Sequence, residues 1–355
     1  MSSVQKIIET SNYFSALKEE LSGCKAPLFV YTESFKKRDQ FKKIQNISHE
    51  SFSDFSYNPD YESIVNGAEV FKKNNCDGLV SIGGGSSIDV AKGIKHILNK
   101  KDLMHISIPT TSGTGSESTQ FAVVYKNGIK TSLDSKELLP DIAILDGSLT
   151  RTLPDFQKRC TLLDALCQCI ESHWSLASTS ESRMYSNMGL KFILSNYKQY
   201  LENNLDVYQD IMLGSNFSGR AINITRTTVS HALSYVITKD YGVPHGCAVA
   251  LTIIPFWKYL SSNISNTTHA GGESFMMERL TELSNAFGGE TISEGIDFAD
   301  NTISEILPVT GVQDLDIENI LSHVDINRLK NYPMHLEIND IKKISLDLIS
   351  PRNQK

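Results

Sequence analysis

Three side chains in this sequence have the chemistry of a transition-metal site. Asp164 lies in an otherwise apolar helical stretch (TLLDALCQCI), where a buried carboxylate needs a partner. His231 and His245 follow far downstream, the second of them at the start of a helical segment. One carboxylate and two imidazoles form a mixed oxygen and nitrogen set that suits Fe²⁺ or Zn²⁺. Gln168, four residues after Asp164, shares its helix face.

A second candidate site is a glycine-rich turn that would hold phosphate. A short strand, Leu79–Ile82, runs directly into GGGS, and a helix is expected from Ser87 to Leu98. Glycines let the backbone approach a phosphate, and a helix N-terminus offers free N–H groups. The residues concerned are Gly84, Gly85, Ser86 and Asp89. The run is not the usual GxGxxG fingerprint, and a plain strand–helix turn is the alternative.

A companion loop, PTTSGTGSE (109–117), follows the next expected strand, Ile106–Ile108. Its small hydroxyl and glycine residues, Thr110 and Thr111 among them, form a polar cradle at the end of a strand where open α/β sheets bind ligands. Glu33, just past the first strand, could hold the ribose of an adenosine and repel a 2′-phosphate, which favours NAD over NADP. A solvated loop glutamate is the alternative for Glu33.

The elements that must position these residues change in character along the chain. Strand-like and helical patterns alternate up to residue 153, which predicts an α/β domain with a parallel sheet covered on both faces. From residue 154 long helical patterns dominate, so that 154–355 is expected to be an all-helical domain, with a ligand cleft between the two. The expected strands are 28–31, 51–55, 79–82, 106–108 and 142–145. The expected helices are 61–71, 87–98, 162–174, 183–201, 211–224, 229–237, 247–260, 275–287 and 340–349, the last with Asn339 as N-cap.

Composition narrows the class of protein. The 355 residues are 40% hydrophobic and 21% charged, as in ordinary globular proteins, and the net charge is −7. An acidic chain is not expected to bind nucleic acid by charge. No run approaches the roughly 18 apolar residues of a membrane span, and no export signal begins the chain, so we expect a cytoplasmic protein without membrane contact. The six cysteines, which have no CxxC spacing, are expected to be free thiols.

Taken together, these motifs resemble the iron-containing, or group III metal-dependent, alcohol dehydrogenases over nearly the whole chain. The matching pieces are NP (58–59), GGGSSIDVAK (83–92), PTTSGTGSE (109–117), LLPDIAILD (138–146), TLP (152–154), DALCQCIE (164–171) and SHALSYVITKDYGVPHG (230–246). The resemblance implies a dinucleotide-binding domain followed by a helical metal domain, in the dehydroquinate synthase-like architecture. It also implies NAD(P)H as cofactor, a divalent metal, and a homodimer or larger homo-oligomer.

The resemblance assigns roles to further residues and has two departures. It places Asn58, Thr110, Thr111, Thr119, Phe121 and Lys130 along the cofactor, and it makes Asp164, His231 and His245 the metal ligands. The family usually has histidine where this chain has Gln168, whose carbonyl oxygen ligates more weakly. A further family histidine is replaced by Tyr235, which either passes a proton or only packs.

Within the family, the chain most resembles a subgroup that reduces phosphonoacetaldehyde to 2-hydroxyethylphosphonate. The features that carry this narrower resemblance are Gln168, AINITRTTVSHALSY (221–235) and INRLKNYP (326–333). A phosphonate needs cations, for which Arg226 and Arg220 are candidates, an interhelical ion pair being the alternative for Arg226. The alternative activities are a general short-chain alcohol dehydrogenase of the lactaldehyde, propanediol or butanol type, and a dehydroquinate-synthase-like cyclase. A relative that binds nucleotide without metal is a further alternative, whereas a purely structural helical module leaves the two polar loops unexplained.

Overall fold

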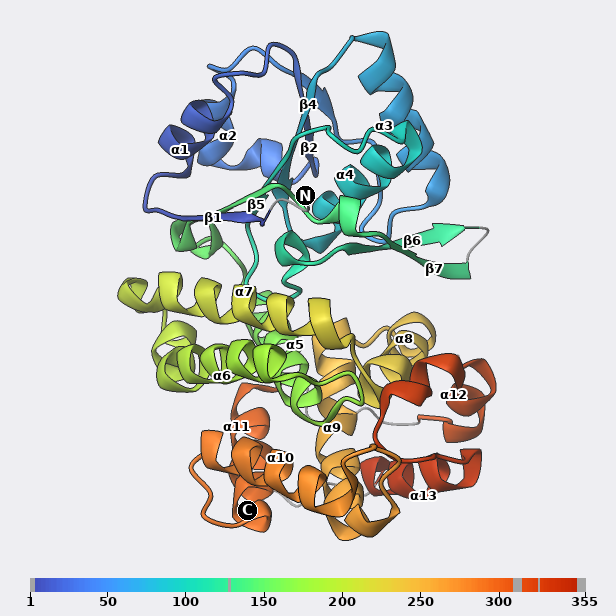
Figure 1. Ribbon diagram of the computed structural model, residues 1–355. Helices are drawn as coiled ribbons and strands as arrows, with labels where there is room; N and C mark the ends of the chain where they lie inside the picture. Colours follow the sequence, from blue (N-terminus) through green and yellow to red (C-terminus); the bar gives the residue numbers. More distant parts are fainter. Residues whose placement is uncertain (1–3, 127–128, 309–314, 325, 350–355) are drawn as a thin grey trace. The chain divides into compact units, whose positions relative to one another are not determined.

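The computed structural model describes residues 4–126, 129–308, 315–324 and 326–349. The chain divides into two units, Met1–Leu153 with Asn203–Gly219, and Pro154–Glu202 with Arg220–Lys355. The first contains a parallel sheet with helices and the second is helical, which confirms the predicted fold class (Figure 1). The first division falls between Leu153 and Pro154, and the segment Asn203–Gly219 also groups with the first unit.

The sheet of the first unit has six parallel strands in the order β1-β8-β5-β4-β2-β3. Their bounds are β1 (Lys6–Glu9), β2 (Pro27–Tyr31), β3 (Glu50–Phe52), β4 (Gly78–Gly83), β5 (His105–Pro109) and β8 (Ile142–Leu145). The central strands β2, β4 and β5 are completely buried, as expected for a sheet covered on both faces. β1 was not predicted, and the expected strand at 51–55 is shorter and ends at Phe52.

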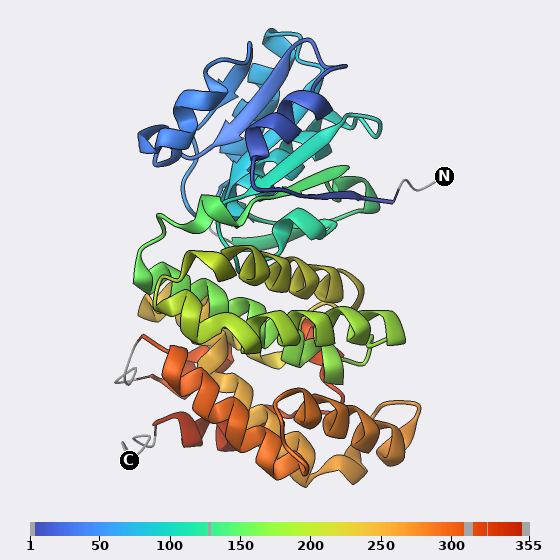
Figure 2. The same cartoon turned by 90° about the vertical axis from the view of Figure 1, so that its left-hand side faces the viewer.

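Helices cover both faces of this sheet (Figures 1 and 2). Alternate side chains of each strand point to opposite faces, so Phe29 of β2 joins one core cluster and Leu28 the other. The first cluster includes residues of α1 (Tyr13–Glu20) and α2 (Asp39–Ile44), neither of which was predicted. The second includes residues of α3 (Tyr61–Lys73) and α4 (Gly85–Leu98). A hairpin of β6 (Phe121–Lys126) and β7 (Ile129–Asp134) completes the unit.

The first part of α7 (Tyr208–Thr225) belongs to the same unit for reasons of hydrogen bonding and packing. Gln209 accepts a 2.7 Å hydrogen bond from the Gly147 amide and donates to the Leu145 carbonyl. Asn216 donates to Glu117 and to Ser118 at 3.0 and 2.6 Å. These contacts attach a segment that is distant in the sequence to β8 and to the loop after β5.

The second unit is built around α5 (Asp155–Trp174), in which every residue from Leu162 to Trp174 is buried. α5 packs against α6 (Ser180–Leu201) and α9 (His245–Ser262), and α9 in turn packs against α8 (Val229–Tyr241). The remaining helices are α10 (Gly272–Ala286), α11 (Ile292–Ile306), α12 (Ile317–His323) and α13 (Ile338–Ile349). α13 begins one residue before Asn339, so the prediction of Asn339 as its N-cap is wrong.

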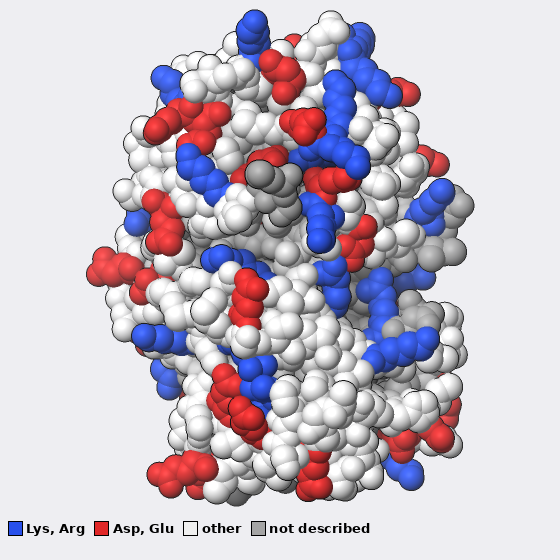
Figure 3. All heavy atoms as spheres, viewed as in Figure 1, with Lys and Arg blue, Asp and Glu red and all other residues white. Residues whose placement is uncertain are grey.

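Within the described residues no helix is long and apolar enough to span a membrane. The six cysteines are free thiols, as predicted. Basic and acidic side chains are interspersed over the face of each unit that Figure 3 shows.

Candidate functional site

Asp164, His231 and His245 come together in the helical unit. Asp164 comes from α5, His231 from the first turn of α8, and His245 is the first residue of α9. One ligand atom from each lies within 4.8 Å of the others. Nε2 of His231 and Nε2 of His245 lie 3.3 and 3.9 Å from Oδ1 of Asp164. Donors bound to one ion at about 2.1 Å lie about 3 to 4 Å apart, so the set fits a divalent metal.

A glycine allows α9 to approach α5 closely enough to form this cluster. Gly246 follows His245, and a Cβ built on it would lie 1.9 Å from the Cys160 carbonyl oxygen and 3.0 Å from Cβ of Asp164. Any side chain at this position would push the helices apart. Cys160 and Cys247 flank the crossing with their sulfur atoms 3.1 Å apart. The glycine is therefore the reason that His245 lies next to Asp164.

Glu171 orients His231 and was not singled out from the sequence. Its carboxylate can only accept, so the 2.7 Å contact with Nδ1 of His231 places a proton on that nitrogen and directs Nε2 toward Asp164. The Thr228 amide and hydroxyl and the Ser230 amide also donate to Glu171, at 2.9, 2.6 and 3.0 Å. A carboxylate behind a ligating histidine is a recurring feature of metal sites. Its position seven residues after Asp164, on the same helix face, was the available signal.

Ser234 performs the corresponding task for His245. The Ser234 hydroxyl donates to the His231 carbonyl at 2.7 Å, so its oxygen accepts from Nδ1 of His245 at 3.1 Å. Nε2 of His245 then carries the lone pair and points to the cluster. Both imidazoles thus present the same nitrogen to Asp164.

The cluster favours ionised carboxylates despite its burial. Burial raises the pKa of Asp164, but the hydrogen bond from His231 and the charge of His245 hold it below its ordinary value. Burial lowers the pKa of His231, but Glu171 and Asp164 together raise it to about 9. An imidazole ligates in its neutral form, so metal binding at this position releases a proton.

Gln168 lies at the edge of the same cluster, one turn after Asp164 on α5, and is buried. Its side chain donates a hydrogen bond to the Asp164 carboxylate, which lowers the pKa of Asp164. The side-chain amide of Gln168 therefore contacts Asp164, next to the ligand position that was predicted for it. In this arrangement its contact with the set is through the N–H group.

Tyr235 and the two arginines named from the sequence lie in the same unit. The Tyr235 ring is parallel to the His245 imidazole, at 4° and 5.5 Å between centroids, which is a packing contact. Arg226 has a φ of 59°, and its Nη1 donates to the Asn223 carbonyl at 2.5 Å. Arg220 stacks on the Tyr185 ring, with Cζ 4.2 Å from the centroid, and donates to its hydroxyl.

In the first unit the polar loops lie at the carboxyl ends of three adjacent strands. Glu33 follows β2, the Gly83–Ser86 turn follows β4, and Thr110 follows β5. The chain leaves β2 for β3 on one side and leaves β4 for β5 on the other. The sheet therefore has a switch point between β2 and β4, where open α/β sheets form a ligand crevice.

The two loops pack directly on each other. A Cβ on Gly84 would lie 3.2 Å from Thr111, and one on Gly85 would lie 3.2 Å from Thr114. The Thr110 amide also donates to the Gly83 carbonyl at 2.9 Å. Bare backbone at the start of α4, faced by threonine side chains, fits a cofactor phosphate.

Two of the residues predicted to bind cofactor, Thr119 and Phe121, accept hydrogen bonds from Lys92. This buried lysine of α4 donates to the carbonyls of Ser116 and Phe121 at 2.6 and 2.8 Å and to the Thr119 hydroxyl at 2.9 Å. Asp89 accepts from the Ser116 hydroxyl and from the Val123 amide. Burial lowers the pKa of Lys92 to about 8. Asp89 and Thr119 therefore fasten the 109–117 loop and the hairpin to α4.

The other predicted cofactor residues are more exposed. Glu33 pairs with Lys36 at 2.5 Å and accepts from the Ser53 hydroxyl, and the Lys36 contact lowers its pKa. The Ser86 hydroxyl donates to the Tyr57 carbonyl, next to the exposed Asn58. Lys130 lies in β7, and its side chain is outside the described part of the structure.

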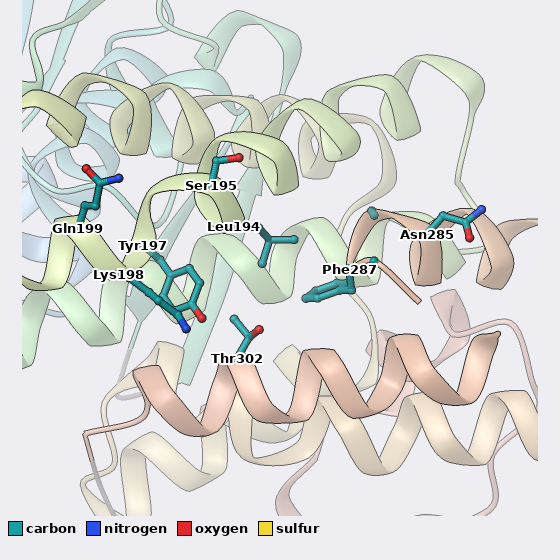
Figure 4. Close-up of a pocket in the computed structure, with 10 residues that line it drawn as sticks. Leu194, Ser195, Tyr197, Lys198, Gln199, Asn285, Phe287 and Thr302 are labelled. Carbon is teal, nitrogen blue, oxygen red and sulfur yellow. The ribbon is translucent and has the colours of Figure 1, made fainter. Parts of the chain in front are cut away.

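A surface pocket of about 590 Å³ lies elsewhere in the helical unit (Figure 4). It is lined by α6, the end of α10 and Thr302 of α11, and none of its lining residues belongs to the donor set. Tyr197 and Lys198, which line it, both contact Glu305, at 2.7 and 3.2 Å. This pocket is not the candidate site.

A parallel α/β unit with a sheet switch point and a helical unit with an Asp–His–His set are the architecture expected of a metal-dependent dehydrogenase. A protein-family sequence model, described as iron-containing alcohol dehydrogenase, matches residues 5–147. A second, described as Fe-containing alcohol dehydrogenase family, C-terminal, matches residues 159–340. The chain belongs to the iron-containing alcohol dehydrogenase family, and it is an oxidoreductase that reduces aldehydes to alcohols.

Individual proteins of known name are similar to this chain in sequence or in structure over half of its length or more. Alcohol dehydrogenase 4 of Schizosaccharomyces pombe is 28% identical over 286 residues, covering 74% of this chain and 68% of that protein. Phosphonoacetaldehyde reductase of Streptomyces viridochromogenes is 28% identical over 224 residues, covering 56% and 57%. The crystal structure of sulfoacetaldehyde reductase from Bifidobacterium kashiwanohense in complex with NAD⁺ has a TM-score of 0.86 and 25% identity, covering 98% and 97%.

Proposed function

We propose that this enzyme reduces phosphonoacetaldehyde to 2-hydroxyethylphosphonate with NAD(P)H, NADH being favoured, and a divalent metal, Fe²⁺ or Zn²⁺. The convergence of Asp164, His231 and His245 on one point carries the proposal, because one ligand atom from each lies within 4.8 Å of the others. The substrate rests on the similarity to reductases of phosphonoacetaldehyde and sulfoacetaldehyde. Both names describe a two-carbon aldehyde with an anionic headgroup.

In the reaction one hydride and one proton are added to the aldehyde, and NADH becomes NAD⁺. The nicotinamide supplies the hydride, and the metal supplies Lewis-acid polarisation of the aldehyde oxygen. Asp164, His231 and His245 hold the metal, while Glu171 and Ser234 keep both imidazoles in the ligating tautomer. Gln168 either completes the set or anchors a water on it, and it orients Asp164 in both cases.

The cofactor side is assigned to the crevice of the first unit. Gly84, Gly85 and Ser86 receive the pyrophosphate at the start of α4. Thr110 and Thr111 line the opposite wall, with Asn58, Phe121 and Lys130 further along. Glu33 receives the ribose, and Asp89 and Thr119 act by holding the loop in place. The proton comes from solvent, the cofactor ribose or Tyr235.

A small aldehyde panel tests the proposal. Initial rates are measured with phosphonoacetaldehyde, lactaldehyde, butyraldehyde and glyceraldehyde, with NADH and with NADPH, under added Fe²⁺ or Zn²⁺. We expect kcat/KM for phosphonoacetaldehyde to exceed that for the neutral aldehydes by at least about 100-fold, which corresponds to about 3 kcal/mol. Equal values would instead identify a general short-chain alcohol dehydrogenase. Cofactor consumption that does not continue with aldehyde would favour a cyclase.

A further inference from the structure

The donor set is accessible from the side of His245. The Asp164 and His231 side chains are 5% and 3% exposed, whereas the His245 side chain is 33% exposed. A substrate whose aldehyde oxygen reaches the donor set therefore passes His245. The side chains that contact this imidazole are therefore the candidates for contacting the remainder of the substrate.

The Tyr235 ring lies parallel to the His245 imidazole, and the Arg328 guanidinium lies over Tyr235. The Tyr235 and His245 centroids are 5.5 Å apart, and Cζ of Arg328 is 4.8 Å from the Tyr235 centroid. Arg328 is half-buried, so its charge is less screened than that of a surface arginine. The five N–H donors of a guanidinium lie in its plane, in a fork that matches two oxygens of a phosphonate or sulfonate.

The backbone that carries Arg328 is fixed by Asn331, three residues later. Nδ2 of Asn331 donates to the carbonyls of Thr225 and Thr227 at 2.7 and 3.0 Å. Its Oδ1 accepts from the Ser175 hydroxyl at 2.9 Å. The two carbonyls flank Arg226, so Asn331 ties the Arg328 segment to the loop between α7 and α8.

That loop is also part of the metal site's support. Thr228 donates to Glu171 with both its amide and its hydroxyl, and Glu171 orients His231. The backbone segment of Arg328 is thus connected to the support of the donor set through the hydrogen bonds of Asn331 and Thr228. A fixed backbone reduces the ordering cost of binding a ligand group, because only the side chain of Arg328 remains to be ordered.

We propose that Arg328 binds the tetrahedral oxyanion headgroup of the substrate and selects aldehydes that carry one close to the carbonyl carbon. This inference rests on the proposed function, and it assigns to Arg328 the selection of aldehydes with an oxyanion headgroup. Phosphonate and sulfonate present the same fork of oxygens, and they differ in charge. Arg226 lies on the tied loop and donates to the Asn223 carbonyl, whereas Arg220 is engaged with Tyr185.

The test compares Arg328→Gln and Arg328→Lys with the wild type on phosphonoacetaldehyde, sulfoacetaldehyde and the neutral propanal. Because hydrogen bonds to charged groups are worth about 1.5 to 3 kcal/mol, Arg328→Gln should lower kcat/KM for the charged aldehydes about 10- to 100-fold, mainly through KM. The value for propanal should stay within about twofold. Arg328→Lys should recover part of the loss, because it keeps the charge and loses the fork.

Lys239→Gln is the matched control, because Lys239 is an exposed cation on α8, one turn after Tyr235. Equal losses in Lys239→Gln and Arg328→Gln would overturn the proposal in favour of general electrostatic steering. An equal loss for charged and neutral aldehydes in Arg328→Gln, with a lowered Tm or metal content, would overturn it in favour of a structural role. A wild type that reduces propanal as well as both charged aldehydes would reject the proposed substrate, independently of either variant. A larger wild-type kcat/KM for one charged aldehyde, with the selective loss in Arg328→Gln, supports the proposal and identifies the headgroup.

Discussion

Nδ1 of His231 lies 2.7 Å from Oε2 of Glu171, and both side chains are buried. The carboxylate accepts four hydrogen bonds in all, from His231, Ser230 and twice from Thr228. These four hydrogen bonds occupy the lone-pair positions of the carboxylate, so a proton on Glu171 would face one of the donors. The orientation of His231 depends on Glu171 being an ionised acceptor.

Glu171→Gln should consequently weaken both the metal site and the fold. The introduced NH₂ group would face N–H or O–H donors of Thr228, Ser230 or His231, and these buried donors would lose their acceptor. We expect metal affinity to fall about 10- to 100-fold and the free energy of unfolding to fall by about 3 kcal/mol. Competition with a chromogenic chelator and urea unfolding measure the two effects. Wild-type affinity in a folded variant would show that Glu171 does not orient the ligand.

Gln168→His should tighten metal retention. Gln168 is buried one turn after Asp164 and touches its carboxylate, and an imidazole is a stronger donor than an amide oxygen. We expect the half-time of metal loss to excess chelator to lengthen by about tenfold. Gln168→Leu, which keeps similar volume and has no donor, is the control and should shorten it. If neither substitution changes the half-time, Gln168 is not at the ligand position.

Tyr235→Phe distinguishes the two roles left open for this residue. The ring lies parallel to His245 and beneath Arg328, so packing alone predicts that Phe keeps kcat within about threefold and Ala does not. A proton donor predicts a drop of about 100-fold or more in Tyr235→Phe, with a changed pH profile of kcat. Steady-state rates from pH 6 to 9 separate these outcomes.

His173 should make the helical unit sensitive to acid. It is completely buried on α5, and burial lowers its pKa to about 4 from the ordinary 6.5, against the opposing charge of Glu282. Because the folded-state value is the lower one, the associated stability is fully present above pH 6.5 and is lost as the pH falls toward 4. The loss amounts to at most about 3 kcal/mol. Urea unfolding of the wild type and His173→Leu at pH 7 and pH 4.5 tests this, and parallel pH dependence in the two proteins would contradict it.

The sequence predicted the donor set because each residue type carries its own chemistry, and helix spacing placed Asp164 with Gln168. It did not predict the tautomer of either histidine, because Glu171 and Ser234 act through hydrogen bonds that exist only after α5, α8 and α9 pack. The burial of Lys92 was not predicted either, because a lysine within a motif gives no sequence signal that it will be buried. β1 and the grouping of 203–219 with the sheet were missed because both depend on partners far away in the sequence.

The direct test of the central assignment is metal content and activity in a single preparation. Wild type, His231→Ala and His323→Ala are purified without chelator, analysed for iron and zinc, and assayed for NADH oxidation with phosphonoacetaldehyde before and after added Fe²⁺. His323 is exposed and outside the donor set, so it controls for the loss of a histidine. We predict a stoichiometric metal and activity in the wild type and in His323→Ala, and the loss of both in a folded His231→Ala. Full metal content and activity in His231→Ala would contradict the account.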